Sequence, residues 1–367
     1  MYKDERNGEV KGILTVIVLS VSVLVSGGCT GSGDYRVTYL GEEVKERAQH
    51  VSPEAVYELP DSILSYYAYV CGGRYAVCQM ETREYSAEVY DLATGTMAGR
   101  LLHYGNGPGE VLFPRYSVNC DTIYVNDFSR KKLHSIPISS LPSGKVSKTY
   151  DVEFMSASYF PHRGSLVALN PYWFSDEETG IDNGEPLLFR SDGKEIPYDT
   201  DKVFSLNVTQ GELLSSPDGE RIMYARMSEP YVVFLDGDLR TVREVHGPMD
   251  CKARYVEGAG GLGFWGSSCH SYMSSCADAE SVYLLYEGVE RSLSDDSIDW
   301  DHSPHDLYVF RFDWDGELVS SYVLDGVTSV VTNLSSGPVP GTLYVSTLFP
   351  DRENLHILYY DLNKASR

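Results

Sequence analysis

The chain has 367 residues, with 53 acidic side chains against 30 Lys and Arg, and a formal net charge of −23. A protein that binds nucleic acid needs a dense basic surface to displace counterions from phosphates, so this charge argues against a nucleic-acid-binding function. Hydrophobic residues make up 42% of the chain and charged residues 23%. These fractions are typical of a folded protein and argue against both a disordered chain and a multi-span membrane protein.

Residues 1–28 have the pattern of a signal sequence. Three basic residues within the first eleven positions precede an uncharged stretch from Gly12 to Gly28. Its apolar centre, Ile13–Val25, is shorter than the roughly 20 residues that a membrane-spanning helix needs. We therefore predict that residues 1–28 are absent from the mature protein. The alternative is an N-terminal membrane anchor or a buried helix.

The signal sequence ends in small residues, Ser26-Gly27-Gly28, directly before Cys29. This ending resembles the bacterial lipobox. The resemblance implies that Cys29 becomes the acylated N-terminus, that residues 29–34 form a lipidated, flexible tether, and that residues 35–367 form one domain. It also implies an envelope protein held at the outer membrane by its lipid alone. Whether the domain faces the periplasm or the cell surface is left open by the sequence.

From about Tyr66 onward, short apolar or alternating runs are separated by Gly, Pro, Asp or Asn, which is typical of all-β folds. One type of run recurs, an apolar strand that in most copies ends near an Asp. Its central residues are Tyr90, Ile136, Phe189, Phe234, Phe310 and Tyr359. The spacings are 46, 53, 45, 76 and 49 residues, and four of these five fit a propeller blade of four strands.

Two segments resemble known propeller repeats. The segment Tyr104–Val111, followed by Phe113-Pro114 and Ile123–Asp127, resembles an NHL-type repeat, and Ser216-Pro217-Asp218-Gly219 is similar to the turn of TolB-like repeats. The resemblance implies a six-bladed β-propeller with four antiparallel strands per blade, in which loop insertions in the fifth blade account for the long interval. We expect Tyr35–Leu40 and Val56–Leu59 to complete the last blade beside Leu355–Leu362. The alternative is a pair of two-sheet sandwiches.

Six cysteines remain once Cys29 is assigned to the lipid. An even number in an oxidising compartment permits disulfides, but the pairing cannot be deduced from sequence. Cys269 and Cys276 lie close together in a Gly/Ser-rich stretch, so they are the one pair that we predict.

An acidic segment contains Asp299, Asp301, His302 and His305, which could bind calcium or another divalent metal. The spacing matches no known calcium loop, and in a chain this acidic a solvated insertion explains it better. We therefore expect no cofactor, with calcium or another divalent metal as the alternative.

Asp313-Trp314-Asp315-Gly316 is predicted to form a hairpin turn rather than a calcium loop.

Three tryptophans, Trp173, Trp265 and Trp300, have loop-like neighbours. Aromatic rings exposed at the rim of a propeller can stack on sugars or anchor a protein partner. We predict that these residues contribute to a binding face.

The chain contains no Gly-x-Ser-x-Gly nucleophile elbow. We therefore favour a non-catalytic binding or scaffolding lipoprotein that holds a protein or glycan partner on one propeller face. The alternative is a propeller enzyme of the lactonase, lyase or glycosidase type. Such an enzyme would place a metal or paired carboxylates at the central channel, with acids and histidines converging from the starts of several innermost strands.

The lipid anchor is testable by the substitution Cys29→Ala. If Cys29 is acylated, the substitution abolishes partitioning into the detergent phase and removes the mass of the acyl chains. Mass spectrometry and detergent partitioning of the membrane-extracted protein provide the measurement. Unchanged mass and partitioning in the variant would contradict the prediction.

Overall fold

The computed structural model describes residues 35–60, 67–80, 84–152, 154–156, 158–169, 172–173, 188–191, 194–196, 211–248, 255–258, 261–264, 267–292, 306–327, 330–348 and 354–365. The chain divides into the units Met1–Gly33 and Asp34–Arg367, and all of the described residues belong to the second. Within them no helix is long and apolar enough to cross a membrane.

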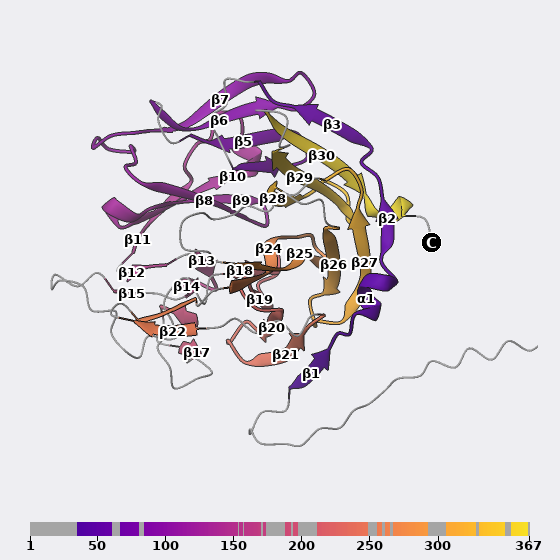
Figure 1. Cartoon of the computed structure of the whole chain (residues 1–367). Coiled ribbons are helices and arrows are strands. Elements are labelled where there is room, and N and C mark those ends of the chain that lie inside the picture. Colours follow the sequence, from indigo (N-terminus) through magenta and orange to yellow (C-terminus); the bar gives the residue numbers. More distant parts are fainter. Residues whose placement is uncertain are drawn as a thin grey trace, which may run out of the picture. The chain divides into compact units, whose positions relative to one another are not determined.

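The described strands form six sheets of four or five strands and two short ribbons (Figure 1). Sheet I contains β4 (Ala68–Cys71), β5 (Tyr75–Gln79), β6 (Tyr85–Asp91) and β7 (Thr96–His103). Sheet II contains β8 (Pro114–Asn119), β9 (Thr122–Asp127), β10 (Lys132–Pro137) and β11 (Lys148–Asp151). Sheet III contains β13 (Ser158–His162), β14 (Ser165–Leu169), β16 (Leu188–Arg190) and β17 (Lys194–Ile196).

The other three sheets each include a strand from the N-terminal segment. Sheet IV contains β18 (Gly211–Ser215), β19 (Arg221–Arg226), β20 (Tyr231–Asp236), β21 (Thr241–His246) and β1 (Arg36–Tyr39). Sheet V contains β24 (Ser267–Ala277), β25 (Ser281–Ser292), β26 (Tyr308–Asp313), β27 (Leu318–Leu324) and β2 (Gln49–Val51). Sheet VI contains β28 (Val330–Ser336), β29 (Thr342–Leu348), β30 (Leu355–Asp361) and β3 (Ala55–Glu58).

The remaining elements are short. One ribbon joins β12 (Phe154–Met155) and β15 (Tyr172–Trp173), and the other joins β22 (Tyr255–Gly258) and β23 (Gly261–Phe264). The helical elements are α1 (Glu43–Glu46), η1 (Phe128–Arg130), η2 (Ile138–Ser140) and η3 (Leu362–Lys364). The ribbon β22–β23 lies between sheets IV and V in the chain, so it helps to explain the long interval between Phe234 and Phe310.

Each sheet packs face to face against the next one in the chain. Side chains alternate between the two faces of a strand, so one strand can contribute to two hydrophobic layers. On β25, Tyr283 and Leu285 join a cluster with sheet VI, whereas Leu284 and Tyr286 join a cluster with sheet IV. Because both faces are covered, the strands are apolar over much of their length and not only on one face.

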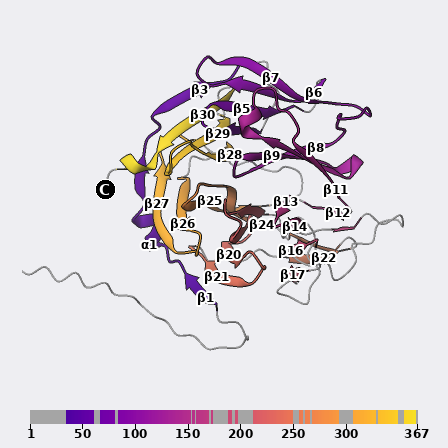
Figure 2. The same ribbon diagram turned by 180° about the vertical axis from the view of Figure 1, so that it is seen from behind.

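The same packing repeats between every pair of neighbouring sheets. Hydrophobic clusters join sheet I to II, II to III, III to IV, IV to V and V to VI. A further cluster joins sheet VI to sheet I, where Leu355 and Ile357 lie in one cluster with Ala68 and Val70. The predicted all-β propeller with antiparallel strands is confirmed by this arrangement (Figure 2). Each of the six marker residues also lies on the third strand of a different sheet.

The predicted hairpin turns are also present. Asp313–Gly316 connects β26 to β27, and the Asp313 carboxylate accepts hydrogen bonds from the backbone N–H groups of Asp315 (3.0 Å) and Glu317 (2.8 Å). Ser216–Gly219 connects β18 to β19. Gly316 and Gly219 have φ of +79° and +70°, a conformation that residues with a side chain rarely adopt.

The N-terminal segment follows the outer edges of three sheets in turn (Figure 1). β1 pairs in parallel with β21, β2 pairs in parallel with β27, and β3 pairs antiparallel with β30. The prediction that Val56–Leu59 completes the last sheet is therefore correct for β3. The prediction that Tyr35–Leu40 also completes the last sheet is wrong. This segment forms β1 and pairs with sheet IV, because α1 and β2 follow it along the edge of sheet V and separate it from sheet VI.

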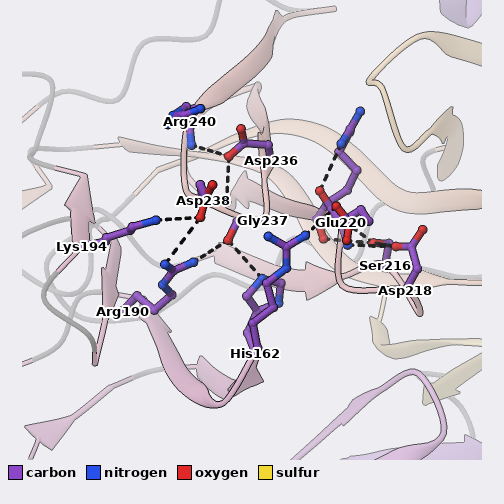
Figure 3. Close-up of polar contacts among 12 residues, drawn as sticks. His162, Arg190, Lys194, Ser216, Asp218, Glu220, Asp236, Gly237, Asp238 and Arg240 are labelled. Carbon is purple, nitrogen blue, oxygen red and sulfur yellow. Dashed lines mark hydrogen bonds and ion pairs between the residues drawn. The ribbon is translucent and has the colours of Figure 1, made fainter.

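Buried arginines connect sheets III, IV and V through the backbone of turns, and Figure 3 shows the contacts of Arg190 with the turn at Gly237. Arg190, on β16, donates from Nη1 to the carbonyl oxygen of Gly237 in the turn between β20 and β21, and His162 Nε2 lies 3.3 Å from the same oxygen. Arg243, on β21, donates from Nε to the carbonyl oxygen of Asp315 in the next such turn (2.9 Å) and from Nη1 to Thr38 on β1 (2.9 Å). These bonds fix each sheet relative to its neighbour.

The contribution of the buried arginine can be measured with Arg190→Met, which keeps a long apolar side chain but leaves the Gly237 carbonyl without this donor. We expect it to lower the free energy of unfolding by about 1–3 kcal/mol, because the buried Gly237 carbonyl loses its charged donor and keeps only the longer contact with His162. The matched control is Lys194→Met, which removes an exposed ion pair with Asp238 and should cost about 0–1 kcal/mol. Urea unfolding of both variants gives the comparison, and equal losses would contradict the assigned role of Arg190.

Candidate functional site

A cavity of about 590 Å³ lies where the first strands of the sheets meet. Its lining includes residues of β4, β8, β13, β18, β24 and β28, which are the first strands of sheets I to VI. In a propeller the first strand of each blade lies closest to the axis, so this cavity is the central channel. A volume of several hundred Å³ is within the range of small-molecule binding sites.

The described part of this cavity is lined by neutral polar side chains and, in similar number, by aliphatic ones such as Val70, Ile138 and Leu213. Hydroxyl groups come from Ser117, Ser139, Ser158, Ser275, Ser335 and Ser336, and amide groups come from Asn119 and Asn333. The rings of Tyr69 and Tyr116 also line it, and the Tyr69 hydroxyl donates to the Tyr116 carbonyl oxygen (2.8 Å). The cavity therefore offers many uncharged donors and acceptors together with aromatic surface.

Several of these groups connect the first strands of different sheets. Asn119 donates from Nδ2 to Ser215 Oγ (2.9 Å), which connects β8 to β18. The backbone N–H of Val70 donates to Ser335 Oγ (3.0 Å), which connects β4 to β28. The polar lining is thus positioned by hydrogen bonds between sheets, and a ligand would meet a preformed surface.

Glu212, the second residue of β18, is one of two carboxyl groups in this lining, and the other is the exposed Asp121. Ser275 Oγ on β24 donates to Glu212 Oε2 (2.9 Å). Burial raises the pKa of Glu212 to about 7, against the opposing effect of the Ser275 hydrogen bond. At neutral pH the group therefore exchanges readily between its acidic and ionised forms, which suits proton transfer or a ligand that binds one form selectively.

Two thiols also line the cavity, and both are held in their neutral form. Cys120 donates from Sγ to the Ser215 carbonyl oxygen (3.5 Å), and burial raises its pKa to about 11. Burial raises the pKa of Cys276 well above its ordinary value. Because the thiolate is the nucleophilic form, neither cysteine is activated as a nucleophile.

Most of the site residues predicted from sequence lie outside the described residues. These are Cys29, Trp265, Trp300, Asp299, Asp301, His302 and His305. Trp173 is in β15, on the short ribbon with β12. Among the described residues, no group of three or more His, Cys, Asp or Glu side chains is arranged to hold a metal ion.

The predicted disulfide between Cys269 and Cys276 is wrong. Cys269 is disulfide-bonded, but Cys276 is a free, buried thiol. Both residues lie on β24, and seven residues of extended strand separate their Cα atoms by roughly 20 Å. A disulfide needs Cα atoms no more than about 7 Å apart.

Sequence reasoning did not single out Glu212. The signal was present, since Glu212 lies four residues before the Ser-Pro-Asp-Gly turn of the TolB-like segment and therefore on the strand that leads into that turn. An acid on an innermost strand is the feature that the enzyme alternative required. It could not be recognised before the first strands of the sheets were assigned.

No protein-family model matches the chain, and no curated protein matches it. Among solved structures, a member of the DUF4221 family from Bacteroides vulgatus is 13% identical with a TM-score of 0.55, covering 86% of this chain and 98% of that one. A candidate exported protein from Bacteroides fragilis is 10% identical with a TM-score of 0.44, covering 88% and 98%. The calcium-binding protein regucalcin from Agrobacterium tumefaciens is 13% identical with a TM-score of 0.39, covering 89% and 96%. The first likeness shows a shared fold alone, and the other two are too distant to carry an argument.

The ionisation of Glu212 can be tested through stability. With a pKa near 7 in the folded protein and an ordinary value of 4.5, the folded state binds more protons than the unfolded state between these pH values. The free energy of unfolding therefore decreases as the pH rises through this window. The decrease is roughly 1–2 kcal/mol, because water in the cavity screens part of the effect. Glu212→Gln should remove this fall. Urea unfolding at pH 5 and pH 8 measures it, and an identical pH dependence in both proteins would contradict the assignment.

Proposed function

We propose that the protein is a non-catalytic binding protein of the bacterial envelope, anchored by a lipid on Cys29, that holds a neutral, hydroxyl-rich ligand such as a glycan at the central cavity. One observation carries this proposal. The cavity lining includes six serines, two asparagines and the tyrosines Tyr69 and Tyr116. Hydroxyl and amide groups exchange hydrogen bonds with sugar hydroxyls, and aromatic rings stack on the apolar faces of sugars.

The proposal includes the closed ring that frames this cavity. We interpret sheets I to VI as six blades, supported by the six hydrophobic clusters that link each sheet to the next and the last sheet to the first. The tryptophans Trp173, Trp265 and Trp300 stay a prediction for the rim of the same face. Either a free glycan or the glycan of a protein partner would suit this site. The location in the envelope depends on the signal sequence and the lipobox-like ending.

A second candidate function is supported by Glu212. A carboxyl group with a pKa near 7 is suited to act as a general acid or base. Asp121 also lines the cavity and is exposed, so a second carboxylate is available at the same site. An enzyme of the lactonase, lyase or glycosidase type would use Glu212 to transfer the proton and Asp121 to orient water or substrate.

The test begins with residues 30–367 on an array of neutral oligosaccharides, and the strongest hit is then titrated calorimetrically. The variant Ser117→Trp fills the cavity from β8 and should weaken binding by at least about ten-fold, because a bulky ring excludes the ligand from the lining. The matched control is Thr96→Trp on β7, the outermost strand of sheet I, which should stay within about two-fold of the parent.

Two outcomes would overturn the binding proposal. One is an array with no saturable neutral ligand, and the other is equal weakening by both tryptophan variants. The enzyme alternative would instead be supported if the protein turns over the bound oligosaccharide or a lactone and if Glu212→Gln loses this turnover.

A further inference from the structure

A second cavity, of about 610 Å³, lies on sheet II, apart from the central one. One wall is the loop after β7, at Pro108 and Gly109. The other groups include three basic side chains, Arg130 from η1 and Lys132 and His134 from β10. Lys132 and His134 are two residues apart on one strand, so they lie on the same face of the sheet.

The loop wall is fixed by Arg130. Its Nη1 donates to the carbonyl oxygens of Gly107 and Glu110, both at 2.8 Å. The Glu110 carboxylate in turn accepts a hydrogen bond from the backbone N–H of Gly107 (2.5 Å). Arg130 Nε and Nη2 have no hydrogen-bond partner among the described residues, so three of the five guanidinium N–H groups are free to donate to a ligand.

His134 forms the second part of the site. The residue is only 7% exposed, and its Nδ1 lies 2.9 Å from the Thr149 hydroxyl on β11. Its Nε2 is buried and has no hydrogen-bond partner in the described part of the chain. A buried polar atom without a hydrogen-bond partner lowers the stability of the folded protein by about 1–3 kcal/mol. A bound ligand atom would remove that cost.

The local charge differs from that of the rest of the protein. Residues 105–151 contain six Lys and Arg but only four Asp and Glu, giving +2, whereas the rest of the chain carries −25. Lys132 is paired with Asp151, but both side chains are well exposed, at 39% and 85%. Exposed pairs of this kind contribute little, so an incoming anion can take the place of Asp151.

We infer that this cavity binds the anionic group of a small organic acid, which Arg130, Lys132 and His134 surround while the apolar part of the acid contacts Pro108 and Val146. Arg130 supplies a planar pair of donors that matches a carboxylate or a phosphate. Lys132 supplies charge, and His134 Nε2 supplies one further donor when Thr149 donates to Nδ1. The site is independent of the central cavity and of the function proposed for it.

The test titrates the full mature domain with sodium benzoate, and separately with inorganic phosphate, at constant ionic strength, while following the imidazole resonances by NMR. Benzamide is the uncharged analogue of benzoate. We expect saturable binding of benzoate with a shift of the His134 resonance, and binding of benzamide at least about ten-fold weaker. Tighter binding of phosphate than of benzoate would still support the anion site, but would assign it to a phosphate group and not to a carboxylate.

Lys132→Met tests the site without altering a buried residue, and it should weaken benzoate binding at least about five-fold. The matched control is Lys148→Met, which removes the same charge from β11 at a residue outside the cavity lining and should change binding less than about two-fold. His134→Gln is the second variant, with thermal unfolding as the check on its fold. The inference is overturned if neither anion binds saturably, if benzamide binds as well as benzoate, or if the two lysine variants are equally weakened.

Discussion

The pairing of β3 with β30 is the constraint on which the rest of this fold depends. Sheet VI takes its outermost strand from residues that precede sheet I in the chain, so the two ends of the domain are joined by backbone hydrogen bonds. Before β3, the same N-terminal segment covers the outer edge of sheet IV with β1 and that of sheet V with β2. Exposed strand edges are sites of aggregation, so the segment both closes the fold and protects three consecutive edges.

Closure determines what lies at the centre. Because each sheet is packed between two others, its first strand is held against the first strands of its neighbours, and polar side chains on those strands bond to one another. Ser335 on β28 reaches Val70 on β4, and Ser275 on β24 reaches Glu212 on β18. Each bond connects residues far apart in sequence. Glu212 therefore owes its raised pKa to closure, since an open arrangement would expose the carboxyl group to water.

The sequence allowed the strands to be predicted well because they are local. The six marker residues all lie on third strands, and the turns at Asp313–Gly316 and Ser216–Gly219 form where their residue types indicate. The wrong predictions concerned distant partners. The sequence does not show that β1 pairs with sheet IV through the path of α1 and β2. Nor does it show that Cys269 and Cys276 lie on one extended strand, which keeps them far apart. Glu212 was missed because its importance comes from the neighbours that folding gives it.

Hydrogen exchange of the native protein, followed by mass spectrometry, tests closure most directly. The backbone N–H of Glu54 donates to Tyr359 (2.8 Å) and that of Leu59 to Leu355 (3.1 Å). If β3 closes the ring, the amides of residues 54–59 are as well protected as those of β30. Peptides from both segments then exchange slowly and at the same rate, because exchange requires global unfolding. Exchange of residues 54–59 within seconds to minutes, while β29 and β30 stay protected, would show that β3 is a loosely attached edge strand and would contradict the account.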